Sequence, residues 1–142
     1  MVHNGIEYGD MQLCCEAYSL LKDCLKLSHN EIGNIFEAWN KTELDSFLIQ
    51  ITADIMKFKN SDGKALVSEI KDTAGQKGTG KWTAISALEL GIPVTLIGES
   101  VFARCLSSLK EERIEASKKL TGPANSFEGD SQEFVEHIRK VI

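Results

Sequence analysis

The chain has 142 residues, of which 42% are hydrophobic, and its formal net charge is −5. This length fits one domain that can bury a real core, and the negative charge argues against nucleic-acid or membrane binding through bulk electrostatics. The sequence contains no run of about 18 apolar residues and no basic stretch followed by an apolar one at its start, so neither a membrane span nor a leader is expected.

The four cysteines do not have the spacing of a metal or redox site. Cys14 and Cys15 are adjacent, Cys24 and Cys105 stand apart, and no CxxC pair occurs. Buried thiols of a cytoplasmic protein are the default interpretation. A zinc site is not expected, because the histidines stand far from any paired cysteine motif.

Helical periodicity predicts an all-α fold of about six helices, with long first and fifth helices. The first runs from Val2 and ends near Leu27. Its recurring apolar residues are Val2, Ile6, Leu13, Ala17, Leu20, Leu21 and Cys24.

One face of this first helix is polar. Residues at three- and four-residue spacings share that face, namely His3, Asn4, Glu7, Tyr8 and Met11. Beside it, Gly5 and Gly9 cost roughly 1 kcal/mol each relative to alanine, which predicts a close backbone approach there. A polar face alone is usually a solvated surface, whereas this cluster with flanking glycines favours a site.

Two shorter helices and a turn follow. Ser28 or Asn30 starts the second helix, and Asp45 or Ser46 caps the third. Their predicted inward residues are Ile32, Ile35, Phe36 and Trp39 in the second and Phe47, Leu48, Ile51, Ile55 and Met56 in the third. Residues 60–63, Asn-Ser-Asp-Gly, are typical of a turn.

A loop rich in glycine and lysine comes next. Gly75 to Lys81 has the GxxxxGK spacing of a P-loop, but Trp82 stands where Ser or Thr would hold Mg²⁺. Residues 67–73 are not the buried strand that a P-loop requires, so the ATPase interpretation fails. A loop that leads into a helix N-terminus favours phosphate or carboxylate, and a flexible basic surface loop is the alternative.

The fourth helix follows this loop and stops at Gly91. A very long fifth helix is predicted from Pro93 to Leu120, closed by residues 121–123, and Asp130 caps a last helix that reaches Ile142. Strand-type alternation is nearly absent. No later segment covers the last helix's apolar face, which predicts exposed apolar surface and oligomerisation or poor solubility. That face carries Phe134, Val135, Ile138 and Val141.

Four segments together resemble one enzyme family. They are GQKGTGKWT at 75–83, MVHNGIEYGDMQ at 1–12, WNKTELDSFL at 39–48 and FARCLSS at 102–108, in the family's order. The chain is therefore identified as similar to 6-phosphogluconate dehydrogenase, the decarboxylating enzyme of the pentose phosphate pathway. The resemblance extends to about residue 123. It implies that residues 1–142 are part of the helical domain of a cytoplasmic oxidoreductase.

The resemblance also implies roles for individual residues. Oxidation of a β-hydroxy acid gives a β-keto acid, which loses carbon dioxide and leaves an enol that must be protonated. Glu7 would be the general acid that delivers this proton. The 6-phosphogluconate substrate would be held by His3 and Asn4 on its hydroxyl and carboxylate oxygens and by Tyr8, Lys77, Thr79 and Arg104 on its phosphate.

Other implied parts of the family enzyme lack a match in this sequence. The family uses NADP, but no G-x-G-x-x-G follows a strand here, so the N-terminal dinucleotide-binding domain is expected to be absent. The family's general-base lysine immediately precedes the residue that matches Met1, and its C-terminal tail completes the neighbouring subunit's site. We expect no activity from the 142 residues alone, and association as a homodimer or with an intact subunit. A non-catalytic truncated homologue or interaction module is the alternative.

Overall fold

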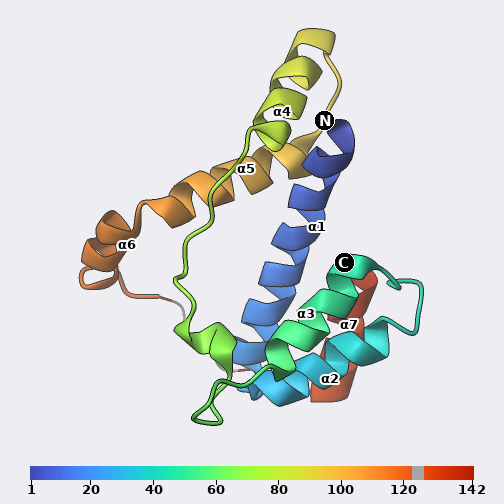
Figure 1. The fold of residues 1–142 in the computed structure, drawn as a ribbon, viewed down its shortest axis with the longest axis vertical. Helices are drawn as coiled ribbons and strands as arrows, with labels where there is room; N and C mark the ends of the chain where they lie inside the picture. Colours follow the sequence, from blue (N-terminus) through green and yellow to red (C-terminus); the bar gives the residue numbers. More distant parts are fainter. Residues whose placement is uncertain (123–126) are drawn as a thin grey trace. The chain divides into compact units, whose positions relative to one another are not determined.

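The computed structural model describes residues 1–122 and 127–142, and these contain seven α-helices and no β-strand (Figure 1). The helices are α1 (Val2–Ser19), α2 (His29–Trp39), α3 (Phe47–Lys57), α4 (Thr79–Leu90), α5 (Thr95–Ser108), α6 (Lys110–Ser117) and α7 (Ser131–Val141). A π-helical turn, Leu20–Cys24, continues α1, and a 3-10 turn, Leu66–Glu69, follows α3. The predicted all-α class is confirmed. None of these helices is both long enough and apolar enough to cross a membrane.

The helix starts that the capping residues predict are confirmed. Ser28 caps α2 in a capping box, in which its hydroxyl accepts from the Glu31 N–H and the Glu31 carboxylate accepts from the Ser28 N–H at 2.8 Å. Ser46, rather than Asp45, caps α3. The Asp130 carboxylate caps α7 through two backbone N–H groups. These starts depend on side chains within three residues of the helix, which is why the sequence reveals them.

The predicted stop of α4 and the turn after α3 are also confirmed. Gly91 ends α4 in the left-handed region with φ of 68°, which costs glycine little. In the turn, the Gly63 N–H donates to the Asn60 carbonyl at 3.0 Å.

The predicted end of the first helix is corrected. Regular α-helix stops at Ser19, and the Leu25 N–H then donates to the Leu20 carbonyl five residues back, which makes a π turn. Leu21 is fully buried and Leu20 is exposed, which continues the three- and four-residue spacing of the buried residues Cys14 and Ala17. Lys26 then takes a positive φ of 58°, which ends the helical backbone before Leu27.

The predicted fifth helix from Pro93 to Leu120 is wrong. Pro93 lies outside α5, which begins at Thr95, and the helix breaks at Leu109, whose ψ is 52°. At the break, the Arg113 guanidinium donates to the Ser107 carbonyl at the end of α5 at 3.0 Å, and it also bonds Asp72, 41 residues away in the chain. α6 starts again at Lys110 and ends at Ser117. Of the predicted closing residues 121–123, Pro123 lies outside the described residues.

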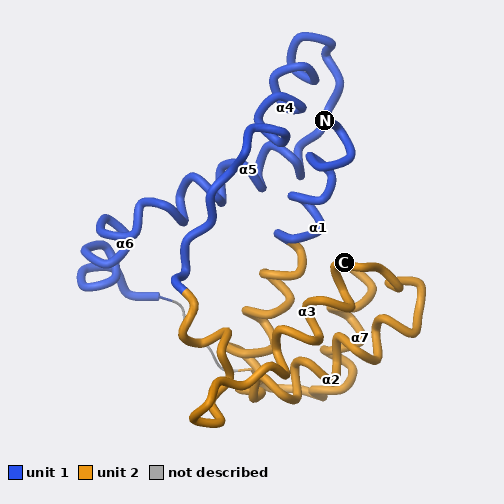
Figure 2. The backbone as a smooth tube through the Cα atoms, viewed as in Figure 1, with its two compact units in different colours: residues 1–12, 71–123 blue, residues 13–70, 124–142 orange. Residues whose placement is uncertain are grey.

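The chain divides into two compact units (Figure 2). Among the described residues, unit 1 comprises 1–12 and 71–122, and unit 2 comprises 13–70 and 127–142, so that α1 contributes to both. The core of unit 2 is built by α1 and its π turn, α2, α3 and α7. Its buried residues are Cys14, Ala17, Leu21, Ile32, Phe36, Trp39, Ile49, Ala53, Met56 and Ile138.

The inward face of α3 is only partly as predicted. Met56 is buried, but Phe47, Ile51 and Ile55 are exposed. The buried stripe is instead Ile49, Ala53 and Met56, at spacings of four and three residues. A helix that is apolar on most sides does not show in its sequence which side faces the core.

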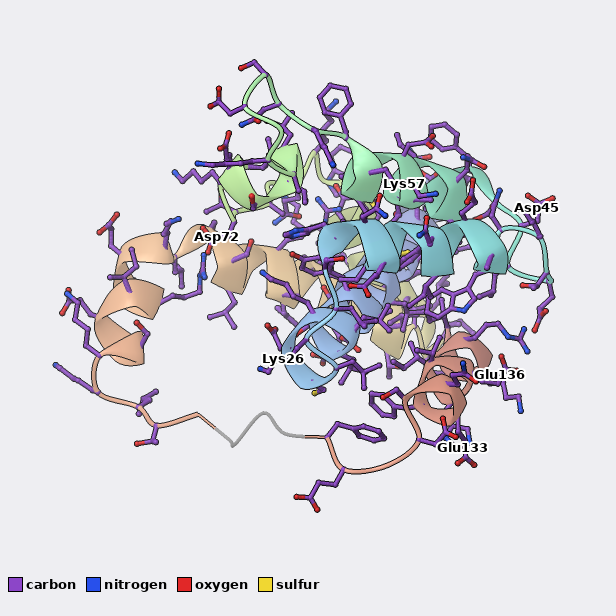
Figure 3. The ribbon with its side chains drawn as sticks, turned by 90° about the horizontal axis from the view of Figure 1, so that it is seen from below. Lys26, Asp45, Lys57, Asp72, Glu133 and Glu136 are labelled. Atoms are coloured by element: carbon purple, nitrogen blue, oxygen red, sulfur yellow. The ribbon has the colours of Figure 1, made fainter. Side chains whose placement is uncertain are left out.

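The prediction that the apolar face of α7 is uncovered is also wrong, except at Val141. Ile138 is 3% exposed, and Phe134 and Val135 pack against the core of unit 2. The Arg139 guanidinium pairs with Glu136 of α7, which is labelled in Figure 3, and with Glu43. Val141 is exposed, as expected.

The cysteines differ from the expected buried thiols. Cys14 is buried and Cys24 is half-buried, but Cys15 and Cys105 are exposed.

Candidate functional site

Unit 1 brings the start of α1 against α4 and α5 by way of glycines. A Cβ on Gly5 would lie 2.7 Å from Thr83 Oγ1 of α4, and a Cβ on Gly9 would lie 3.0 Å from the Leu96 side chain of α5. The close backbone approach predicted at these two glycines is confirmed. The predicted apolar positions at the start of α1 do not pack, since Val2 and Ile6 are about half exposed.

Tyr8 lies at the centre of this contact. It is buried, and its ring touches Gly80, where a Cβ would lie only 2.8 Å from Tyr8 Cδ2. Its hydroxyl accepts a hydrogen bond from the Lys77 N–H at 3.2 Å. This bond is the main reason that the pKa of Tyr8 lies below its ordinary value; burial acts against it, and the Thr79 side chain and the charges of Arg104 and Lys77 add to it. Tyr8 therefore couples α1 to the glycine- and lysine-rich loop.

Arg104 of α5 completes the group around Tyr8. Its guanidinium carbon lies 4.0 Å from the centroid of the Tyr8 ring, in a cation–π contact. Its Nη1 donates to the Gly75 carbonyl at 2.6 Å, and its Nη2 lies 3.5 Å from the Met11 sulfur. The guanidinium is thus held in one orientation between the loop, α1 and α5.

The loop ends at the N-terminus of α4. Gly78 is the N-cap residue with φ of 102°, and its lack of a side chain leaves no cap for the first N–H groups of the helix. No acidic residue lies in the first turn, Lys77 is exposed just before it, and Thr79 is the first helical residue. A positive helix end with a lysine, a threonine and a neighbouring arginine is suited to an anion.

His3, Asn4 and Glu7 form a second group on the first two turns of α1. His3 Nδ1 lies 3.2 Å from Asn4 Oδ1 and 3.9 Å from Glu7 Oε1. The His3 side chain is 81% exposed and that of Glu7 is 39% exposed. Glu7 precedes Tyr8 in the chain, so α1 contributes residues both to this group and to the group around Tyr8.

The structure therefore brings Tyr8, Lys77, Thr79 and Arg104 into one contact group, and His3, Asn4 and Glu7 into another. Met11 and Gly75, which orient Arg104, were not predicted as site residues. Met11 shares the polar face of α1, but a thioether and a backbone carbonyl give no sequence signal of such a role. Within the described residues, no cluster of three or more His, Cys, Asp or Glu is placed to hold a metal ion.

Fold and site define an α-helical domain with a candidate anion site between a helix N-terminus and a polar helix face. The family described as 6-phosphogluconate dehydrogenase, C-terminal domain, matches residues 1–142. The chain is 72% identical to the decarboxylating 6-phosphogluconate dehydrogenase of Ovis aries and 69% identical to that of Homo sapiens. In both cases 100% of this chain and 30% of the relative are covered.

A solved structure of Plasmodium falciparum 6-phosphogluconate dehydrogenase matches with a TM-score of 0.87 and 40% identity, over 98% of this chain and 30% of that one. That enzyme was solved in its apo form, in complex with its cofactor NADP⁺ and in complex with its substrate 6-phosphogluconate. The present chain belongs to the 6-phosphogluconate dehydrogenase family, and it spans 30% of the length of these relatives. The family predicted from the sequence motifs is confirmed.

Proposed function

We propose that this chain supplies the substrate-binding helical part of an NADP-dependent, decarboxylating 6-phosphogluconate dehydrogenase of the cytoplasmic pentose phosphate pathway. The substrate-binding residues are His3 and Asn4, on the hydroxyl and carboxylate oxygens, and Tyr8, Lys77, Thr79 and Arg104, on the phosphate. Support for the substrate comes from the relatives' names and from the 6-phosphogluconate complex of the Plasmodium falciparum enzyme.

One observation carries the phosphate assignment: the Tyr8 hydroxyl bonds the Lys77 N–H while the Arg104 guanidinium lies against the Tyr8 ring. Residues that carry two cations and two hydroxyls, Lys77, Arg104, Tyr8 and Thr79, thereby lie near the N-terminus of α4. Arg104 offers a planar fork of donors and Lys77 a point charge, which together suit a phosphate dianion.

Glu7 is the general acid of the reaction. Loss of carbon dioxide from the β-keto acid leaves an enol, and the Glu7 carboxyl gives its proton to the enol carbon. The Glu7 side chain is partly exposed and lies one turn after His3 on α1. It is therefore accessible to a substrate held by His3 and Asn4.

NADP would accept the hydride in this reaction, but the described residues do not form a site that fits a dinucleotide. A dinucleotide is held by the glycine-rich turn of a βαβ unit, and the described part of the chain has no strand from which to build one. The 142 residues alone are therefore expected to form no NADPH from 6-phosphogluconate and NADP. NADPH formation that Glu7→Gln abolishes would contradict this expectation.

The chain also pairs with a second copy of itself. α4 and α5 enclose an apolar groove of about 420 Å³, whose lining includes the exposed side chains of Ile85, Leu88 and Phe102. Lys81 and Glu99 lie in the same lining with opposite charges. In a two-fold pair, where the same surface meets itself, each can face its opposite on the other copy.

The phosphate assignment is tested by binding. Without the rest of the family enzyme, the affinity for 6-phosphogluconate should be about millimolar. In NMR titrations, 6-phosphogluconate should bind more tightly than gluconate, and Lys77→Ala should weaken it by about tenfold, the loss expected for a charged hydrogen bond. Lys118→Ala is the matched control, because it removes an exposed lysine of unit 1 that pairs with Glu115. Equal affinity for both ligands would refute the phosphate site.

A further inference from the structure

The loop before α4 is bonded to the C-terminal part of α5. We define the strap as residues 72–77. Its middle residues make three successive contacts with α5: the Ala74 N–H donates to Ser107 Oγ at 2.9 Å, Arg104 donates to the Gly75 carbonyl, and Gln76 Nε2 lies 3.5 Å from Cys105 Sγ. The strap ends where the Lys77 N–H meets the Tyr8 hydroxyl.

At its other end the strap is anchored by one carboxylate. Asp72, labelled in Figure 3, pairs with Lys110 of α6 through Oδ1, and its Oδ2 accepts from both Nη atoms of Arg113 at 3.1 Å. Arg113 Nη2 also donates to the Asp72 carbonyl at 2.9 Å and to the Ser107 carbonyl at 3.0 Å. The same guanidinium thus holds the start of the strap and the end of α5.

We propose that Asp72, through Arg113 and Lys110, is a positioning residue that sets the strap in register with α5 and so places Lys77 for phosphate binding. This inference rests on the proposed function of the site. The register follows from geometry, because Asp72 is fixed to α6, the next residues bond along α5, and Lys77 reaches Tyr8 five residues later.

The exposure of the anchor separates this role from a purely structural one. The Asp72 side chain is 59% exposed, and Lys110 and Arg113 are about one-third exposed. Exposed ion pairs contribute little to the stability of a whole domain. Loss of the carboxylate should therefore release the strap while the packing of α1, α4 and α5 stays in place.

The test is a double-mutant cycle on the full 142-residue chain. Dissociation constants for 6-phosphogluconate and gluconate are measured by NMR for wild type, Asp72→Asn, Lys77→Ala and the double variant. Asp72→Asn should weaken the binding of 6-phosphogluconate by about fivefold and should change the binding of gluconate little. In the Lys77→Ala background, Asp72→Asn should cause no further loss of affinity, because the effects of coupled neighbours are not additive. Asp72→Glu should restore part of the affinity, and Glu115→Gln, which removes another exposed ion pair of α6, should change neither ligand.

The positioning role would be overturned if Asp72→Asn weakened the binding of both ligands equally. It would also be overturned if Asp72→Asn caused the same loss of affinity with Lys77 as in the Lys77→Ala background. Unchanged binding in Asp72→Asn would overturn it too. Amide hydrogen exchange provides a readout that needs no ligand. Asp72→Asn should speed exchange at Ala74 and Lys77 but leave exchange within α4 unchanged, and no change in the strap would refute the inference. If wild type does not prefer 6-phosphogluconate to gluconate, the proposed function fails and the exchange experiment alone decides on the strap.

Discussion

Tyr8 joins several parts of the candidate site in unit 1. Its ring packs on Gly80 and under the Arg104 guanidinium, and its hydroxyl accepts the Lys77 N–H. In a buried setting, each of these contacts limits where the loop can lie. A phenylalanine at this position would keep the packing and lose only the hydroxyl.

We expect Tyr8→Phe to change how stability depends on pH. The pKa of Tyr8 is lowered, chiefly by the hydrogen bond from the Lys77 N–H, so the folded state favours the phenolate. The contribution of Tyr8 ionisation to folding stability is present above the ordinary tyrosine pKa of 10.0 and is lost as pH falls through the lowered pKa. Thermal melts across this alkaline range should show wild type gaining stability relative to Tyr8→Phe. Tyr18→Phe is the matched control, since Tyr18 bonds His29 in unit 2, and parallel curves for wild type and Tyr8→Phe would contradict the expectation.

Asp72 gives a second prediction, at acid pH. Hydrogen bonds from Lys110 and then Arg113 lower the pKa of Asp72 from 3.8 to about 2. A depressed carboxyl pKa contributes stability, small here because the pair is exposed, that is present above 3.8 and is lost as pH falls through about 2. In a carbon-detected titration, the Asp72 carboxyl should titrate near 2 in wild type and near its ordinary value in an Arg113→Ala, Lys110→Ala double variant. Titration near 3.8 in wild type would show that the anchor is not formed.

At the scale of elements, the glycines of α1 predict the outcome of two alanine substitutions. Alanine favours a helix over glycine by about 1 kcal/mol, but a Cβ at Gly5 would lie 2.7 Å from Thr83 Oγ1 and 3.1 Å from Thr83 Cβ. Overpacking of this kind costs about 1–3 kcal/mol, so Gly5→Ala should lower the melting temperature. Gly98→Ala in α5 is the control, because nothing lies within 4 Å of its Cβ position, and it should be neutral or stabilising. A stabilising Gly5→Ala would mean that α1 does not pack closely on α4.

The elements also show which features a sequence can predict. The caps at Ser28, Ser46 and Asp130 were readable because each depends on a side chain and backbone groups a few residues away. The break at Leu109 was not, and the Arg113 side chain beside it bonds Asp72, a partner 41 residues distant that leaves no local pattern. The helical pattern of polar and apolar residues continues through Leu109, so the local sequence does not indicate that one helix ends and another begins there.

The candidate site divides in the same way. Tyr8, Lys77 and Arg104 were found from motifs, and the structure brings them into contact. The residues that orient them, Gly75 and Ser107, were not predicted. Backbone carbonyls and serine hydroxyls are common in any sequence, and these two acquire a role only because the strap bonds to α5.

At the scale of the whole molecule, the main exposed apolar surface of unit 1 lies on α4 and α5. Leu88 is 83% exposed and Phe102 is 67% exposed, and both line the groove. An apolar patch bordered by charges is typical of an interaction surface. We expect the chain to self-associate reversibly through this face.

Sedimentation velocity over a range of concentrations would test this expectation. Leu88→Glu should shift the chain toward monomer, because two copies would each bury an added carboxylate. Leu120→Glu is the matched control, since Leu120 is also highly exposed but lies outside the groove. Lys81→Glu should weaken association as well, and Lys81→Glu with Glu99→Lys should restore it if the two charges face each other across a two-fold axis. A wild-type chain that stays monomeric at every concentration, or equal effects of Leu88→Glu and Leu120→Glu, would exclude the groove as the contact surface.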